Sequence, residues 1–139
     1  MKEYIHKVHY YETDKMGITH HSNYIRWMEE ARVDLLDQLG FGYAKLEEEG
    51  IISPVIGVEC EYKATTKFSD EIKIEAWVEE FKGVKLIIGY KMTNNKTKDI
   101  VLTGKTKHCF VNSEGKPIIL KKDFPDFAER LKLASEQAD

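Results

Sequence analysis

The sequence has few cysteines and no long apolar run, and both absences exclude classes of protein. Cys60 and Cys109 are far apart and form no Cys-x-x-Cys pair, so we expect two buried thiols in strands rather than a disulfide framework. No apolar run approaches the roughly 18 residues that a membrane-spanning helix needs, and the first residues do not open a signal peptide. We therefore expect a cytoplasmic protein without membrane insertion.

An excess of charge of one sign is missing as well. The formal net charge is -3, with both signs interspersed along the chain, so the sequence creates no field that would attract nucleic acid or a membrane surface. A Gly-x-Ser-x-Gly elbow and a Walker-type phosphate loop are also absent. Their absence excludes the α/β-hydrolase route to ester cleavage and nucleotide hydrolysis.

The 139 residues contain no linker, repeat or low-complexity segment. We expect one domain over residues 1–139, long enough to bury about two thirds of its unfolded-chain surface. The longest helical pattern runs from Ser22 to Leu39, where apolar residues recur at spacings of three and four. Ser22 or Asn23 is suited to cap its start, and Gly40 is suited to end it. Shorter helices are expected over residues 43–49 and about 126–133.

Most of the remaining sequence alternates with period two, which is typical of half-buried antiparallel strands. The expected strands cover residues 4–11, 53–64, 71–79, 84–93 and 100–111. One long helix after the first strand, followed by four long strands, predicts an α+β fold. The helix would pack against a single antiparallel sheet of about five strands.

The most informative segment lies immediately before the long helix. Residues 10–24 read Y-Y-E-T-D-K-M-G-I-T-H-H-S-N-Y, which places the carboxylate of Asp14 near the start of the helix. The first N–H groups of a helix lack intrahelical acceptors and carry a partial positive charge, so the amides near His21 and Ser22 suit a developing oxyanion. A carboxylate facing an anion hole indicates acyl-group chemistry.

The spacing Asp-x-x-Gly-Ile-x-x-His-x-x-Tyr, followed by W-M-E-E-A-R at residues 27–32, resembles the signature of the 4-hydroxybenzoyl-CoA thioesterase family. In that family a curled antiparallel sheet wraps a long helix, which is the hotdog fold. The resemblance extends over about residues 4–117, although Thr65 stands where family members usually carry a proline. It implies hydrolysis of an acyl-CoA thioester to the free acid and coenzyme A, with no cofactor and no metal.

The resemblance also implies roles for residues of this segment. Asp14 would attack the carbonyl carbon or deprotonate an attacking water, and the sequence leaves both routes open. His21 would orient the thioester or the water, and Tyr10 would hold Asp14 in place. Gly17 and Tyr24 belong to the same signature and are expected to lie beside the substrate.

Substrate contacts outside this segment are also implied by the resemblance. Ser53 would border the acyl pocket, and Lys82 and Lys85, on either side of a glycine turn, would bind the phosphates of coenzyme A. Lys67 is a second candidate for the phosphates. Exposed lysines are common, so an ordinary solvated face stays open as the alternative.

The sequence predicts no metal site at its histidines. His6 and His9 are three residues apart in an expected strand, so they should point to opposite faces and should not bind one ion together. A site made of Asp14, His20 and His21 is not expected, because metal sites normally need three or four converging ligands.

Two alternatives to thioester hydrolysis stay open: a hotdog dehydratase or hydratase, and a module that only binds acyl-CoA. Other hotdog thioesterase subfamilies place the catalytic carboxylate on the helix, where Glu29 and Glu30 lie; with Asp14 present, we expect both to be structural. A hotdog dehydratase or hydratase would use such a helix carboxylate, and a non-catalytic acyl-CoA-binding module would not turn over substrate.

A single curled sheet leaves an exposed edge strand, and the resemblance implies a homodimer or homotetramer with sites at the subunit boundary.

Overall fold

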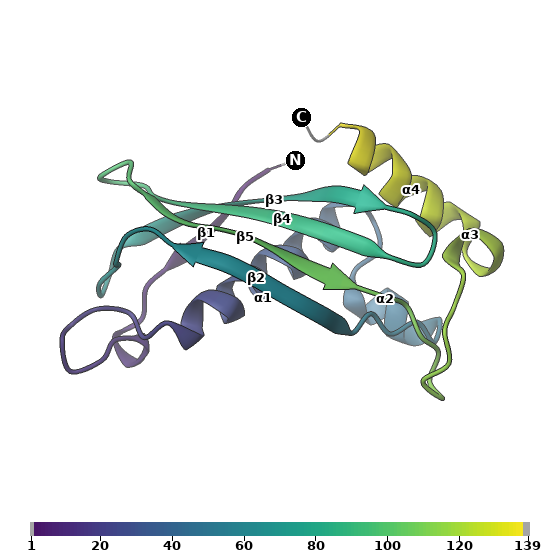
Figure 1. Ribbon diagram of the computed structural model, residues 1–139, viewed down its shortest axis with the longest axis horizontal. Helices are drawn as coiled ribbons and strands as arrows, with labels where there is room; N and C mark the ends of the chain where they lie inside the picture. Colours follow the sequence, from purple (N-terminus) through teal and green to yellow (C-terminus); the bar gives the residue numbers. More distant parts are fainter. Residues whose placement is uncertain (1, 138–139) are drawn as a thin grey trace.

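The computed structural model describes residues 2–137, and one face of its sheet is covered by a long helix (Figure 1). Five antiparallel strands form one sheet in the order β1-β3-β4-β5-β2. The layout confirms the predicted α+β hotdog fold. Its elements, in chain order, are β1 (Tyr4–Lys7), the 3-10 helix η1 (Tyr10–Glu12), α1 (Ser22–Gln38), α2 (Tyr43–Glu48), β2 (Val55–Tyr62), β3 (Glu71–Phe81), β4 (Leu86–Asn94), β5 (Ile100–His108), α3 (Leu120–Asp123) and α4 (Pro125–Glu136).

The hydrophobic core lies between α1 and the inner face of the sheet. The period-two alternation of β3 turns Ile72 and Ile74 inwards, and both are fully buried. From α1, Trp27 and Met28 are fully buried as well. Because burying one such side chain contributes about 1.5–3 kcal/mol, this packing fixes the axis of α1 under the sheet and with it the position of its N-terminus.

The two ends of α1 differ in how well the sequence predicts them. The N-cap position is His21, which makes no side-chain capping bond, rather than Ser22 or Asn23. Instead, Nδ1 of His20 accepts the N–H of Ser22 at 3.2 Å. The predicted stop at Gly40 is confirmed: its φ of +86° is a left-handed conformation that glycine adopts without a Cβ penalty.

The expected first strand is too long. β1 ends at Lys7, and residues 10–12 form a single 3-10 turn in which the N–H of Glu12 donates to the carbonyl of His9 at 3.0 Å. His9 therefore lies outside the strand. The strands β2 and β5 are also shorter than expected, and the short helix α3 was not expected from the sequence.

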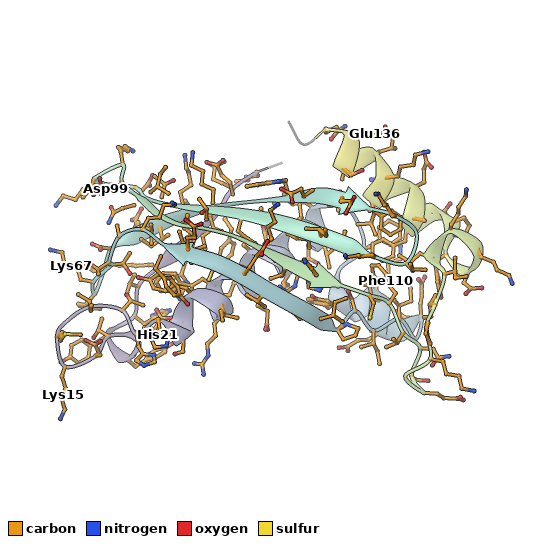
Figure 2. The ribbon with its side chains drawn as sticks, viewed as in Figure 1. Lys15, His21, Lys67, Asp99, Phe110 and Glu136 are labelled. Atoms are coloured by element: carbon orange, nitrogen blue, oxygen red, sulfur yellow. The ribbon has the colours of Figure 1, made fainter. Side chains whose placement is uncertain are left out.

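The molecule has two distinct ends along its long axis. The loop of residues 13–21, the β2–β3 connection and the β4–β5 hairpin lie together at one end, which we call the loop end (Figure 1). The β3–β4 turn, the start of β2 and α4 lie towards the other end. Figure 2 shows Lys15, His21, Lys67 and Asp99 at the loop end and Phe110 at the opposite one. Within residues 2–137, no helix has the length and apolar character that crossing a bilayer requires.

Strand β2 lies at the edge of the sheet. It pairs with β5 on one side only. Four of its apolar residues are between 43% and 58% exposed. They are Val55, Ile56, Val58 and Tyr62. An apolar strand with an unpaired edge is a surface on which another strand can pair.

Candidate active site

A short closed loop carries Asp14. Thr13 and Thr19 form an antiparallel bridge across its base. Inside it, the N–H of Asp14 donates to the carbonyl of Ile18 at 2.8 Å, and the N–H of Gly17 donates to the carbonyl of Asp14 at 2.9 Å. Gly17 has a φ of +80°, which strains any residue with a Cβ. Gly17 therefore serves this loop through its backbone conformation.

The carboxylate of Asp14 is half-buried and only partly engaged. Its Oδ1 accepts the N–H of Met16 at 2.8 Å, a local turn bond that aspartate commonly makes. Its Oδ2 has no hydrogen-bond partner within residues 2–137. One oxygen thus holds the loop, and the other can accept a proton or bond to an electrophile.

The start of α1 supplies one free backbone donor. The amides of Ser22 and Asn23 both bond to His20, through its Nδ1 and its carbonyl oxygen, and the amide of Tyr24 donates to the carbonyl of His21. Within the part of the chain that the structure describes, only the N–H of His21 among these four amides has no acceptor. It lies at the positive end of the helix.

Aromatic side chains connect the start of α1 with the end of β2. Tyr24 is buried, and its hydroxyl lies 3.1 Å from Oγ1 of Thr66, which in turn lies 2.6 Å from Oγ1 of Thr19. The ring of Tyr62 lies 5.4 Å from that of Tyr24 and 6.3 Å from the exposed ring of His21. Partial burial and a neighbouring cysteine raise the pKa of Tyr62. Tyr24 therefore packs against Tyr62, and its hydroxyl is already hydrogen-bonded to Thr66.

Tyr10 does not touch Asp14 with its hydroxyl. Its side chain is 76% exposed and meets the ring of Phe68 edge-on at 5.6 Å. Its carbonyl accepts both the N–H and the hydroxyl of Thr13, at 3.1 Å and 2.7 Å. The influence of Tyr10 on Asp14 therefore passes through the backbone of the turn.

The lysines and Ser53 are divided between the two ends. Lys67 pairs with Ile18 in a backbone bridge, so it borders the loop that carries Asp14. Ser53, Lys82 and Lys85 lie at the opposite end, beside the start of β2 and the β3–β4 turn. The length of β3 separates them from the loop end by roughly 30 Å. A single chain thus does not bring these three residues to Asp14.

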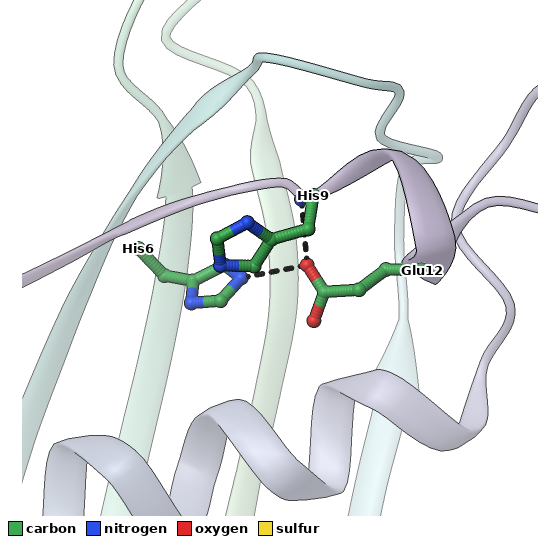
Figure 3. A group of neighbouring side chains, drawn as sticks. All are labelled: His6, His9 and Glu12. Atoms are coloured by element: carbon green, nitrogen blue, oxygen red, sulfur yellow. Dashed lines mark hydrogen bonds and ion pairs between the residues drawn. The ribbon is translucent and has the colours of Figure 1, made fainter.

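A buried carboxylate that the sequence did not single out supports the loop (Figure 3). Oε1 of Glu12 accepts from Nε2 of His6 at 2.9 Å and from the N–H of His9 at 2.8 Å, and Oε2 accepts from Nε1 of Trp27 at 2.7 Å. Burial by itself would raise the pKa of Glu12. The bonds from His9, Trp27 and His6 outweigh it and hold the pKa below its usual value.

The same network continues to α1. Nδ1 of His6 lies 3.0 Å from Oε1 of Glu30, which also accepts the hydroxyl of Tyr4 at 2.8 Å. Burial and the bond to Glu30 raise the pKa of Tyr4 to about 12. Glu30 is therefore bound into a structural network, while Glu29 is exposed.

The expectation that His6 and His9 point apart is wrong, because β1 ends before His9. Their ring centroids are 5.5 Å apart, and the potential ligand atoms of His6, His9 and Glu12 lie within 4.8 Å of one another. Both ring nitrogens of His6 and both carboxylate oxygens of Glu12 are already hydrogen-bonded. An ion could enter this cluster only by breaking those bonds, so its geometry is that of a hydrogen-bonded network.

A second buried network surrounds Arg32, midway along α1. Its guanidinium donates to the hydroxyls of Tyr43 and Tyr90, at 3.1 Å and 3.2 Å, and no carboxylate within residues 2–137 forms an ion pair with it. Tyr90 reaches Oγ1 of Thr106 at 2.6 Å, and Nε2 of His108 reaches the same atom at 2.8 Å. Burial, and then the positive charge of Arg32, lower the pKa of His108 to about 4. His108 is therefore neutral at pH 7.

Comparison with known proteins shows the family to which the chain belongs. Residues 8–132 match the model of the thioesterase-like superfamily. The protein of Bacillus subtilis named "Putative acyl-CoA thioesterase YneP" is 36% identical over 122 residues, which are 87% of this chain and 88% of that one.

Two solved structures are similar along most of the chain. The DHNA-CoA thioesterase from Staphylococcus aureus is 34% identical, has a TM-score of 0.92, and covers 97% of this chain and 91% of its own. A gentisyl-coenzyme A thioesterase is 27% identical, has a TM-score of 0.78, and covers 84% of this chain and 94% of its own. The chain therefore belongs to the hotdog-fold acyl-CoA thioesterase family of the thioesterase-like superfamily.

Proposed function

We propose that this protein hydrolyses an acyl-CoA thioester at the loop end, with Asp14 as nucleophile or general base and the N–H of His21 as the oxyanion donor. One observation supports this above all others. Among residues 2–137, the loop that ends at α1 presents a carboxylate oxygen without a partner and a backbone N–H without an acceptor. A hydrolysis that builds negative charge on a carbonyl oxygen needs these two groups.

The oxyanion donor acts on the charge that develops during the reaction. As the carbonyl carbon becomes tetrahedral, its oxygen gains negative charge, and the N–H of His21 would donate to it. One such donor typically contributes about 2.7–4 kcal/mol to transition-state stabilisation. The imidazole of His21 is exposed beside this amide, where it would orient the thioester or the water.

Asp14 has two routes to the products. As a base, Oδ2 takes a proton from water while the water oxygen bonds to the carbonyl carbon; the C–S bond then breaks, and the proton passes to the departing thiolate. As a nucleophile, a carboxylate oxygen bonds to the carbonyl carbon and the C–S bond breaks, which leaves a mixed anhydride and the thiolate of coenzyme A. Water then cleaves the anhydride.

The similar structures guide the choice of substrates to test. Two of them are named as thioesterases for aromatic acyl groups, DHNA-CoA and gentisyl-coenzyme A. A panel of these two aryl-CoA thioesters with short and long aliphatic acyl-CoA thioesters, assayed by the release of free thiol, will identify the acyl class. The cytoplasmic location stays a prediction from the sequence.

A dimer formed through β2 would complete the site. If two copies pair their free β2 edges antiparallel about a two-fold axis, the start of one strand lies beside the end of the other. Ser53 of one copy, just before Val55, would then approach Tyr62 of the other copy, and Tyr62 lies next to His21. The end of the second copy that carries Lys82 would then lie on the same side as the loop end of the first copy. Residues that one chain keeps apart would thus meet across the axis.

Sedimentation tests this assembly. We expect a dimer or tetramer, and we expect Val58→Lys to weaken it, because Val58 is an exposed apolar residue of β2. A monomeric wild-type protein with full activity would contradict the shared site.

The exchange Asp14→Asn tests the chemistry. It keeps the shape of the side chain and removes its charge, so kcat should fall by at least about 100-fold, in line with acid–base participation. The fold and the affinity for a non-hydrolysable acyl-CoA analogue should persist. Asp99→Asn, an exposed aspartate at the same end, serves as the matched control and should leave kcat unchanged. A near wild-type rate for Asp14→Asn would show that another carboxylate does the work, with Glu29 the next to test.

A further inference from the structure

Glu12 lies two residues before Asp14, at the point where the loop leaves η1. We propose that Glu12 is a positioning residue that fixes Asp14 relative to the start of α1; this inference rests on the proposed role of Asp14. The backbone carbonyl of Glu12 accepts the N–H of His20 at 2.8 Å and Nδ2 of Asn23 at 3.0 Å. The two ends of the loop are thereby joined at one residue.

The side chain of Glu12 anchors that junction in the core. It is only 4% exposed, and its three donors come from three segments: His6 of β1, His9 of the β1–η1 connection and Trp27 of α1. A carboxylate is the one side chain of this length that accepts from all of them, because glutamine would turn an N–H₂ group towards one donor. A buried donor that loses its acceptor destabilises the arrangement around it.

His6 extends the anchor to a second point on α1. Its two ring nitrogens lie at 2.9 Å from Glu12 of η1 and 3.0 Å from Glu30 of α1, so this side chain of β1 is bonded to η1 on one side of the ring and to α1 on the other. The junction of the loop therefore cannot shift along α1 without breaking several buried bonds. This fixes the distance between the Asp14 loop and the free N–H of His21.

Such a constraint matters for rate more than for binding. A misplacement of about 1 Å at a reacting group can cost about 100-fold in rate. Glu12, His6 and Trp27 are buried within the chain, so we expect the substrate to make no contact with them. Loosening Glu12 should therefore lower kcat and leave KM nearly unchanged.

The test compares Glu12→Gln with the wild-type protein. We expect kcat to fall about 10- to 100-fold while KM changes less than about twofold. The decisive measurement is a double-mutant cycle with Asp14→Asn: if Glu12 acts through Asp14, Glu12→Gln should lower the residual kcat of Asp14→Asn by less than about twofold. If Glu12→Gln does not fold, Trp27→Phe removes the donor to Oε2, together with part of a buried ring, and should lower kcat in the same non-additive way.

His9→Gln is the matched control. Its backbone N–H keeps the bond to Glu12, and its exposed ring meets the network only at the ring of His6, edge-on at 5.5 Å, so its kcat should stay near that of the wild type. Stoichiometric zinc in the purified wild-type protein that His9→Gln lacks would overturn the positioning role in favour of a metal site. Full kcat in both Glu12→Gln and Trp27→Phe, or an additive cycle, would overturn it as well. Loss of activity in Asp14→Asn combined with either result would leave the proposed hydrolysis standing.

Discussion

Acid should destabilise this protein through His108 by an amount that can be calculated. The ring is fully buried, its Nδ1 has no hydrogen-bond partner in the part of the chain that the structure describes, and its pKa is about 4, whereas an unfolded histidine has a pKa of about 6.5. Between these two values the unfolded state binds more protons than the folded state. Stability therefore falls as the pH drops through this window, and the loss from this one group is about 2 kcal/mol at pH 5 relative to pH 8.

Urea unfolding at pH 8 and pH 5 measures the effect. The wild-type protein and His108→Gln are compared at one protein concentration, because oligomerisation links stability to concentration. The variant lacks the titrating ring, so its loss of unfolding free energy between the two pH values should be smaller by about 2 kcal/mol. His20→Gln, at an exposed position, should keep most of the wild-type loss. Equal losses in the wild type and in His108→Gln would refute the reasoning.

Three further exchanges test other parts of the structure. His21→Ala should lower kcat less than Asp14→Asn does in the thiol-release assay, because the oxyanion donor is a backbone N–H, and the two losses should not add if both residues serve one step. The double exchange of Lys82 and Lys85 to alanine should raise KM for acyl-CoA far more than for the matching pantetheine thioester; equal effects would place these lysines away from the phosphates. Gly104→Ala should lower the free energy of unfolding in urea by about 1–3 kcal/mol, because its Cβ would lie 2.8 Å from a backbone oxygen of β2. An unchanged midpoint would mean that β2 shifts to accommodate the methyl group at little cost.

The periodicity of apolar residues was sufficient to predict the long helix and the strands from the sequence. The three-and-four spacing located α1 to within one residue, and alternation found all five strands. The end of β1 was missed because the change from strand to 3-10 turn depends on a side chain, that of Glu12, which accepts the N–H of His9. A glutamate three residues after the N-cap residue, as Glu12 is after His9, is half of a capping box, so this signal was present in the sequence.

The candidate site could be proposed from the sequence where it is local and not where it is tertiary. The segment from Asp14 to Tyr24 is continuous, so the resemblance of its spacing to the family signature could point to it. The contact of His6 with Glu30 joins positions that are 24 apart in the sequence, and no short-range pattern encodes it. Arg32 lies four residues after Met28 on the buried face of α1, but charge normally argues for exposure. Its hydroxyl partners come from α2 and β4, which only the fold brings near.

The closed loop and its buried anchor have a consequence for how relatives of this protein can diverge. Every group that we propose for bond cleavage or its support lies between residues 4 and 30, whereas the edge strand and the distant lysines come from residues 53–85. If the proposed roles hold, reactivity and substrate choice are inherited through separate stretches of one gene. Exchanging the later stretch between two family members should transfer acyl preference to a recipient whose turnover chemistry stays its own.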